Sequence, residues 1–147
     1  MQDRFNFRVW DKENKCMHYP TRHSNFANVN GTIVKIESYP TSNSAYFGKR
    51  IAHEFDDAIL MQNIGLKDKN RKLIYEGDIV KNDKNLLYSV LFNSFEHQTK
   101  ICFKRIENPD YYPHISTWQD IGYKDQKNYE VIGNIYENKE LLDEIHN

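Results

Sequence analysis

Residues 62–80 decide the fold, and they read Q-N-I-G-L-K-D-K-N-R-K-L-I-Y-E-G-D-I-V. Short runs rich in branched and aromatic side chains, at 59–65 and 73–75, flank the polar cluster at 67–72. Such a cluster of Lys, Asp and Asn between apolar runs is typical of a turn. The stretch therefore predicts two strands joined as a β-hairpin.

A second reversal follows at once, where the bend Glu76-Gly77-Asp78 separates 73–75 from the next apolar residues, Ile79 and Val80. Glycine takes a positive φ without steric cost, and an Asp side chain accepts hydrogen bonds from the N–H groups of a turn. A strand, a Glu-Gly-Asp bend and a new strand are typical of the start of a small SH3-like barrel. We interpret Gly65, Gly77, Asp78 and Gly133 as structural turn residues rather than as groups that act on a substrate.

The same pattern of polar clusters between apolar runs recurs on both sides of this stretch. A polar cluster at 11–15 separates strands expected at 5–10 and 16–19, and another at 81–85 separates 78–80 from 86–92. Strands at this spacing favour a barrel or sandwich over βαβ units. The predicted fold is mainly β: a compact, small SH3-like β-barrel, built as a meander of hairpins.

Three other segments depart from that pattern. Pro109 and Pro113 lack a backbone N–H, so 108–114 is expected to be a loop or a sheet edge. The stretch 21–49 has little periodicity and is the candidate for a mobile or insertion-tolerant segment. Asn138 is expected to cap a short C-terminal amphipathic helix over 139–145.

Length and composition indicate one domain over residues 1–147, with an N-terminal hairpin and variable region at 1–60 and a barrel core with the helix at 61–147. The chain has 20 basic and 21 acidic residues and a net charge of −1, so no overall field attracts nucleic acid or an anionic membrane. No window approaches the 18 or more apolar residues of a membrane span. The charged, aromatic start lacks the apolar core of an export signal, which favours the cytoplasm.

Three blocks resemble the YopX family of phage and prophage proteins. The first is the opening hairpin around 4–17, the second is 62–80, and the third is the closing stretch 129–138, Y-E-V-I-G-N-I-Y-E-N. Two positions depart from the family pattern: Arg71 stands where the family has Gly, and Lys139 stands where Pro commonly follows Asn138. We expect Asn70 to take the left-handed conformation in place of Arg71.

The resemblance implies a largely β, phage-encoded, self-associating protein that works in the cytoplasm of the bacterial host. It supplies no catalytic residues, so catalysis has to be judged from this sequence. None of the six His residues forms the i, i+4 pair of a helical metal site, and Cys16 and Cys102 are expected to be packed thiols. We therefore predict no enzyme activity, no cofactor and no metal.

One cluster leaves a weaker alternative open. His53, Asp56 and Asp57 lie close in sequence, and on a helix His53 and Asp57 would share one side. They are the candidates for a metal-dependent hydrolase centre. A solvated acidic turn before the strand at 59 is the simpler interpretation.

A second alternative is a nucleic-acid-binding barrel. Basic residues gather at two expected hairpin tips, and Tyr75, Tyr88 and Phe92 nearby are candidate stacking faces. The basic residues are Lys67, Lys69, Arg71, Lys72, Lys81 and Lys84. Lysines at hairpin tips also prevent sheets from pairing with neighbours, and Asp68, Asp78 and Asp83 dilute the positive field.

The sequence therefore predicts a phage accessory protein that binds a host or phage protein and forms homo-oligomers. The abundance of aromatic residues, 10 Tyr and 8 Phe, favours this function because interfaces are enriched in them. Nucleic acid is the less favoured partner, and a membrane is not expected.

Overall fold

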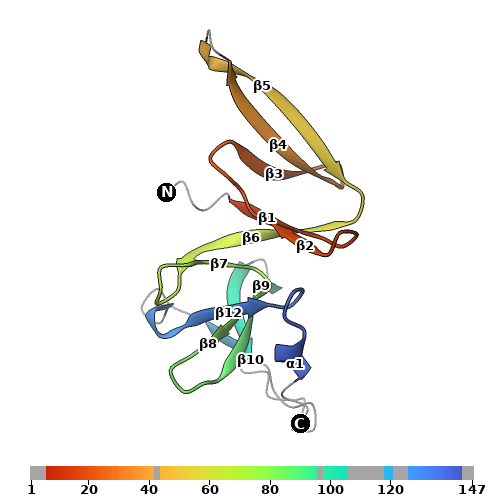
Figure 1. Ribbon diagram of the computed structural model, residues 1–147. Coiled ribbons are helices and arrows are strands. Elements are labelled where there is room, and N and C mark those ends of the chain that lie inside the picture. The colour runs from red at the N-terminus through yellow and green to blue at the C-terminus, as the bar shows by residue number, and fades with distance from the viewer. Residues whose placement is uncertain (1–5, 42–43, 96–97, 106–117, 121–125, 144–147) are drawn as a thin grey trace. The chain divides into compact units, whose positions relative to one another are not determined.

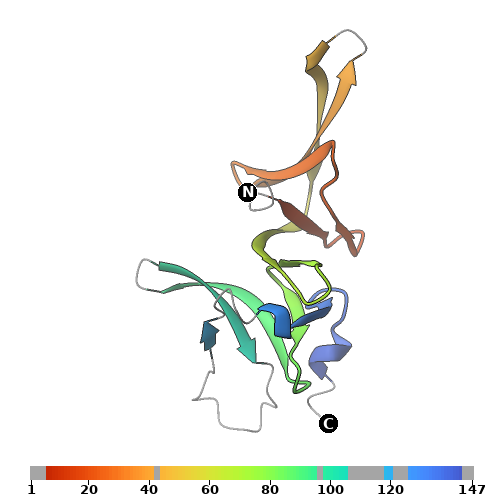
Figure 2. The ribbon, with the colours of Figure 1, turned by 90° about the vertical axis from the view of Figure 1, so that its left-hand side faces the viewer.

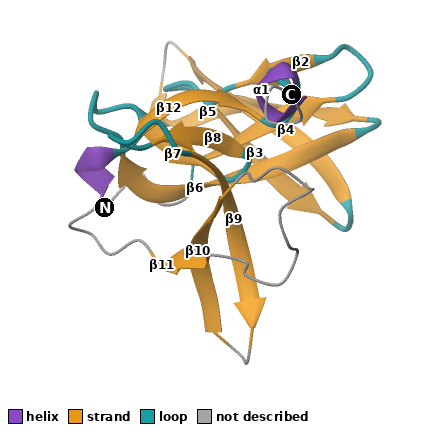
Figure 3. Ribbon diagram, turned by 90° about the horizontal axis from the view of Figure 1, so that it is seen from below, coloured by secondary structure: helices purple, strands orange, loops and turns teal. Residues whose placement is uncertain are grey.

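The protein's structure is a computed structural model that describes residues 6–41, 44–95, 98–105, 118–120 and 126–143. Within these residues the chain is mainly β, with one short α-helix and one 3₁₀ helix (Figure 3). This confirms the fold class predicted from the strand-and-turn pattern. The loop expected at 108–114 lies outside the described residues.

The chain divides into two compact units, Met1–Asn63 and Ile64–Asn147, here called unit 1 and unit 2. Strand β6 (Ala58–Lys67) runs across the boundary between them. The single domain expected over 1–147 stays a prediction.

Unit 1 begins with the expected hairpin, in which β1 (Phe7–Asp11) pairs antiparallel with β2 (Cys16–His18). On its other side β1 pairs antiparallel with the first half of β6. Asp11 holds the hairpin turn, because its Oδ1 accepts the backbone N–H of Asn14 at 2.9 Å. The chain then reverses through Lys15, whose φ is 51°.

A three-stranded antiparallel sheet follows, in the order β3-β4-β5 (Figure 1). Its strands are β3 (Ser24–Val29), β4 (Thr32–Thr41) and β5 (Ser44–Phe55). Asn30 and Gly31 join β3 to β4 with φ values of 52° and 90°, and two consecutive positive φ angles are the mark of a type I′ hairpin turn.

The weakly patterned stretch 21–49 thus contains regular strands where the sequence indicated a variable segment. Polar side chains interrupt the apolar alternation along these strands, yet they satisfy one another. Lys35 pairs with Glu37, and His53 Nε2 lies 3.4 Å from the other oxygen of Glu37. The core of unit 1 forms where the alternation survives, around Val9, Phe26 and Ile33.

Unit 2 is built on a five-stranded antiparallel sheet in the order β11-β10-β9-β8-β12, and β7 pairs with β6 (Figures 1 and 2). Curled antiparallel sheets of this kind are consistent with the small barrel predicted from the sequence. The strands are β7 (Leu73–Tyr75), β8 (Asp78–Lys81), β9 (Leu87–Phe95), β10 (Gln98–Arg105), β11 (Trp118–Asp120) and β12 (Glu130–Asn134). A 3₁₀ turn, Gln126–Asn128, precedes β12.

The core of unit 2 is larger than that of unit 1 and includes buried tyrosines. Tyr88 and Tyr129 meet edge to face, with ring centroids 5.7 Å apart. Burial of aromatic and branched side chains from several strands supplies the main stabilising term of such a unit. The buried residues are Ile64, Leu66, Ile74, Val80, Tyr88, Val90 and Tyr129.

Two turns of unit 2 repeat one design. Oδ1 of Asp68 accepts the N–H groups of Asn70 and Lys72, at 2.8 and 2.9 Å. Oδ1 of Asn82 likewise accepts the N–H groups two and four residues later, at 3.0 and 2.9 Å. In both turns the fourth residue has a positive φ, which is 66° at Arg71 and 60° at Asn85. This is a type I turn closed by a left-handed residue.

The expectation that Asn70 replaces Arg71 in the left-handed conformation is therefore wrong. Arg71 itself has the positive φ. The Asp68 side chain binds the N–H groups of residues 70 and 72, and this fixes the left-handed position between them at 71. Glycine in the family pattern suits the same position without steric cost.

The corner between β7 and β8 depends on Gly77 and Asp78. Gly77 has a φ of 82°, its N–H donates to the carbonyl of Val90, and its carbonyl accepts the N–H of Ile135, both at 2.9 Å. Oδ2 of the buried Asp78 accepts the N–H of Tyr75 at 2.8 Å. The corner therefore links β7, β8, β9 and the residue that follows β12. Gly65, inside β6, also has a positive φ, of 78°.

The closing block forms a compact turn before helix α1 (Glu140–Asp143). Oδ1 of Asn134 accepts the N–H groups of Tyr136 and Glu137, and Oδ1 of Asn138 accepts the N–H of Asn134. The sequence predicted that the Asn138 side chain caps the following helix. Its oxygen instead points back to the end of β12. Gly133 allows this approach, because a Cβ there would lie 2.4 Å from the Asn138 oxygen.

Candidate functional site

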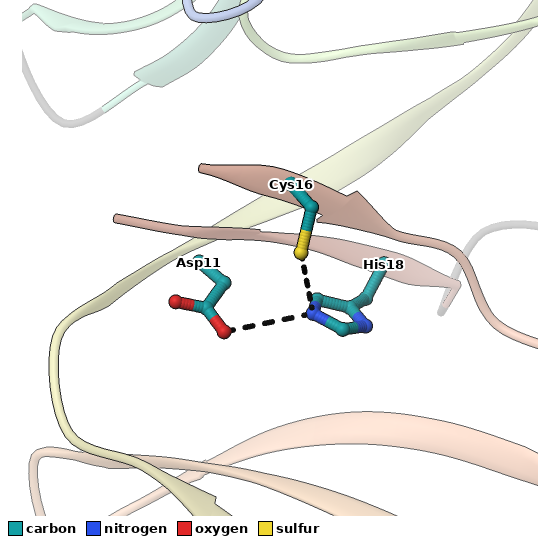
Figure 4. Close-up of side chains that lie close together, drawn as sticks. All are labelled: Asp11, Cys16 and His18. Carbon is teal, nitrogen blue, oxygen red and sulfur yellow. Dashed lines mark hydrogen bonds and ion pairs between the residues drawn. The ribbon is translucent and has the colours of Figure 1, made fainter. Parts of the chain in front are cut away.

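The β1–β2 hairpin brings Asp11, Cys16 and His18 together on one face (Figure 4). Asp11 is paired directly with Cys16 across the two strands, and His18 is paired with Val9. Side chains two apart on a strand share a face, so Cys16 and His18 point the same way. Their ligand-type atoms all lie within 4.8 Å of one another.

His18 lies between the other two side chains. Its Nε2 is 3.3 Å from the Sγ of Cys16 and 3.7 Å from the Oδ2 of Asp11. Its ring packs against the ring of Phe55 in an edge-type contact, with centroids 5.2 Å apart. Asp11 is buried, whereas Cys16 and His18 are half-buried and face solvent in part.

Asn14 holds the carboxylate of Asp11 in its charged form. Its side-chain amide donates to Oδ2 at 2.8 Å and its backbone N–H donates to Oδ1 at 2.9 Å. These two hydrogen bonds, the side-chain one first, lower the pKa of Asp11 below 3.8 despite its burial. The carboxylate of Asp11 is therefore negatively charged at neutral pH.

The cluster does not have the geometry of a nucleophilic triad. In a Cys–His–Asp relay, the thiol contacts one ring nitrogen and the carboxylate orients the imidazole through the other. Here Sγ and Oδ2 both approach Nε2. The sulfur, nitrogen and oxygen atoms of these side chains instead lie close together, as the ligands of a metal ion do.

The sequence did not predict this cluster, because the histidines lack the helical i, i+4 spacing that marks a metal pair on a helix. Cys16-Met-His18 is a Cys-x-His pattern on a predicted strand, and period-2 alternation puts both side chains on one face. Asp11 joins them through the register of the hairpin, which the turn length determines. Cys102 lies on β10, and its side chain is outside the described residues.

The candidates His53, Asp56 and Asp57 are not gathered into a centre. Residues 44–55 form β5, so the helical spacing that would align His53 with Asp57 does not apply. His53 faces Glu37, and Asp57 pairs with Lys12 at 2.7 Å. Asp56 is exposed at the turn after β5.

The six basic candidates all belong to unit 2, on the two repeated turns and the strand ends beside them. Lys67, Arg71, Lys72 and Lys84 are exposed, and Lys81 is half-buried. Lys69 forms an ion pair with Glu130, so its charge is partly neutralised.

The stacking faces expected beside these cations are not on the surface. Tyr75 and Tyr88 are only 5% and 3% exposed. The side chain of Phe92 is outside the described residues. Among the residues that the structure describes, the large apolar side chains exposed to solvent are Tyr19 and Val29, both in unit 1.

A second candidate surface is the open edge of the β3-β4-β5 sheet. The sheet order ends at β5, and one side of that strand pairs with β4 at Ser44 and, after a shift in register, from Lys49 to Phe55. No other strand in the described part of the chain pairs with its second side. An edge of this kind presents unpaired N–H and C=O groups that another strand can bind.

Residues 6–143 match the family described as YopX protein. A solved structure, the crystal structure of protein EF1440 from Enterococcus faecalis, is similar, with a TM-score of 0.55 and 26% sequence identity. The similarity covers 93% of this chain and 96% of that chain. The curated proteins include no match. In the described residues, no helix has both the length and the apolar character needed to span a bilayer.

Proposed function

This chain belongs to the YopX family, and from that premise we propose that it is a phage accessory protein that works by binding, without catalysis. It acts in the cytoplasm of the bacterial host. It associates with a second copy of itself by pairing of strand β5, and the assembled protein binds a host or phage protein.

The observation that carries this proposal is the length of the open edge at β5. β5 has 12 residues, whereas the other strands at the ends of sheets have 3 residues (β2, β7 and β11), 5 residues (β12) or 6 residues (β3). Short edge strands are a common protection against pairing with other chains, and a long open strand lacks it. β5 is therefore the strand best suited to accept another one.

A second copy is the partner that the sequence of β5 fits. Antiparallel pairing of two identical strands about a two-fold axis makes each contact twice. If Ala52 lies on that axis, Arg50 of one copy is opposite Glu54 of the other. Opposite charges directly across two strands stabilise the pair.

A pair of proline variants tests the proposal in solution. Ala52 and His53 are neighbours on β5 and pair with Ile36 and Lys35 of β4. Along an antiparallel edge, alternate N–H groups point toward the paired strand and away from it. Of Ala52→Pro and His53→Pro, one therefore removes a donor to β4 and the other removes a donor to the open edge.

We expect the wild-type protein to sediment as a dimer that dissociates on dilution. The edge variant is the one that removes a donor to the open edge, and it should be a monomer with an unchanged circular dichroism spectrum. The inward variant is the one that removes a donor to β4, and it should lose hairpin structure. A wild-type protein that is monomeric at every concentration contradicts the proposal. A folded edge variant that still forms dimers also contradicts it.

A further inference from the structure

We propose that Asp11, Cys16 and His18 form a binding site for one divalent, borderline-soft metal ion, for which Zn²⁺ is the natural candidate. The proposal does not rest on self-association, because β5 and the β1–β2 hairpin belong to different sheets. Within the described residues, these three form a group of potential ligands whose donor atoms converge.

The donor set matches the chemistry of zinc. Zinc binds thiolate sulfur, imidazole nitrogen and carboxylate oxygen, and it tolerates mixtures of them. Cys16, His18 and Asp11 offer one donor of each kind. Calcium and magnesium prefer oxygen ligands alone, so this set disfavours them.

The distances between donors also fit a tetrahedral ion. Zinc bond lengths and tetrahedral angles put a sulfur and a nitrogen ligand about 3.6 Å apart, and a nitrogen and an oxygen ligand about 3.4 Å apart. The observed separations are 3.3 Å from Sγ to Nε2 and 3.7 Å from Nε2 to Oδ2. The third pair, Sγ of Cys16 and Oδ2 of Asp11, lies within 4.8 Å, and rotation of these side chains would bring the two atoms to the spacing around one ion.

Neighbouring groups orient two of the ligands. Asn14 donates two hydrogen bonds to Asp11, and Phe55 packs its ring against His18. Such supporting contacts are usual around metal ligands and restrict their rotation. The Asp11 carboxylate keeps free lone pairs, because two oxygens offer about four acceptor positions.

Binding has a defined proton balance. The thiol of Cys16 loses its proton to solvent, Asp11 binds as a carboxylate, and His18 binds through neutral Nε2. The negative charges of the Cys16 thiolate and the Asp11 carboxylate then balance the two positive charges of the ion. Three protein ligands leave the fourth tetrahedral position for water, which reaches it because Cys16 and His18 are partly exposed.

Cobalt titration of reduced, untagged protein tests the site, because Co²⁺ replaces Zn²⁺ and is coloured. We expect one equivalent of Co²⁺ to produce a sulfur-to-cobalt charge-transfer band and intense visible bands of tetrahedral cobalt. Zn²⁺ should then abolish the bands. Cys16→Ser should remove the charge-transfer band, whereas Cys102→Ser should leave it unchanged.

Two further variants separate ligands from bystanders. His18→Gln should abolish the tetrahedral spectrum, whereas His53→Gln, a histidine of the same unit, should retain it. Asn14→Ala should weaken binding roughly 10- to 100-fold, the usual effect of removing a group that orients a metal ligand. Absence of a charge-transfer band in the wild-type protein overturns the proposal, and so does an unchanged band in Cys16→Ser.

Discussion

Single side-chain oxygens hold the turns of unit 2 by accepting several backbone N–H groups each. Asp68 accepts three such bonds: Oδ1 accepts two from its own turn, and Oδ2 accepts one from Val131 at 2.9 Å. Asn82 and Asn134 each accept two. Turn N–H groups would otherwise be unsatisfied where the chain packs. This explains why Asp and Asn occupy the polar clusters along the sequence.

Replacement of Arg71 by glycine should stabilise the protein. Arg71 has a φ of 66°, which costs an L-residue about 1 kcal/mol or more and costs glycine nothing. After the greater flexibility of glycine in the unfolded chain is subtracted, we expect Arg71→Gly to raise the free energy of unfolding by about 0.5–1 kcal/mol.

Urea denaturation measures this change, and Asn70→Gly is the matched control. Asn70 does not have a positive φ, so glycine there adds only flexibility and should lower stability. If Asn70→Gly stabilises and Arg71→Gly does not, the left-handed residue has been assigned to the wrong position.

Loss of the Asp68 carboxylate should be costly. Asp68→Ala leaves three backbone N–H groups without their acceptor, one of them on β12, and Asp68 is only 5% exposed. We expect the free energy of unfolding to fall by about 3 kcal/mol. Asp83→Ala, at an exposed position of the second turn, should change it by less than about 0.5 kcal/mol. Equal effects of the two variants would show that Asp68 has no special role.

Contacts between elements connect these turns to the strands. Asn138 packs on Gly133 and binds the end of β12. Gly133→Ala should therefore destabilise unit 2, because the new Cβ displaces the Asn138 side chain from its hydrogen bond. A double-mutant cycle with Asn138→Gly isolates the clash. The two changes together should cost less than the sum of the single changes, and strict additivity would refute this contact.

The Lys69–Glu130 ion pair joins the first turn to β12 and makes stability depend on pH. The hydrogen bond from Lys69, with its charge, lowers the pKa of Glu130 below 4.5. A lowered pKa in the folded state stabilises the protein above pH 4.5, and this contribution is lost as pH falls through the folded pKa.

Lys69→Gln should therefore reduce the loss of stability on acidification. Chemical denaturation at neutral pH and at a pH below 4.5 measures the difference for each protein. Lys84→Gln, which removes an exposed lysine from the second turn, is the control and should behave as wild type. The same acid sensitivity in Lys69→Gln and wild type would contradict the pair.

Hairpins with short turns were the elements that sequence predicted well. Turn residues and period-2 alternation act locally, so the β1–β2 hairpin and the strands around Gly77 followed from the sequence. The β3-β4-β5 sheet did not, because Lys35, Glu37 and His53 break the alternation, and the two cations pair with Glu37 only once the strands are in place. The sequence also predicted that the Asn138 side chain caps the helix, whereas its oxygen accepts the N–H of Asn134. This contact depends on the path of the chain past Gly133, which local sequence does not reveal.

At the scale of the molecule, both of the proposed binding surfaces belong to unit 1. The Asp11, Cys16 and His18 cluster and the open edge of β5 both belong to unit 1. The basic and glycine candidates predicted from the sequence all lie in unit 2, which also holds nearly all of two of the three family blocks. Cross-strand register and sheet order decide the two surfaces of unit 1, and neither can be read from local composition.

Hydrogen exchange along β5 tests the proposed self-association most directly. If two copies pair through this strand, its outward N–H groups become hydrogen-bonded and exchange more slowly as protein concentration rises. The N–H groups of β3, the other end of the same sheet, should exchange at a rate that does not depend on concentration. Exchange along β5 that is equally fast at all concentrations would contradict the binding function proposed for this edge.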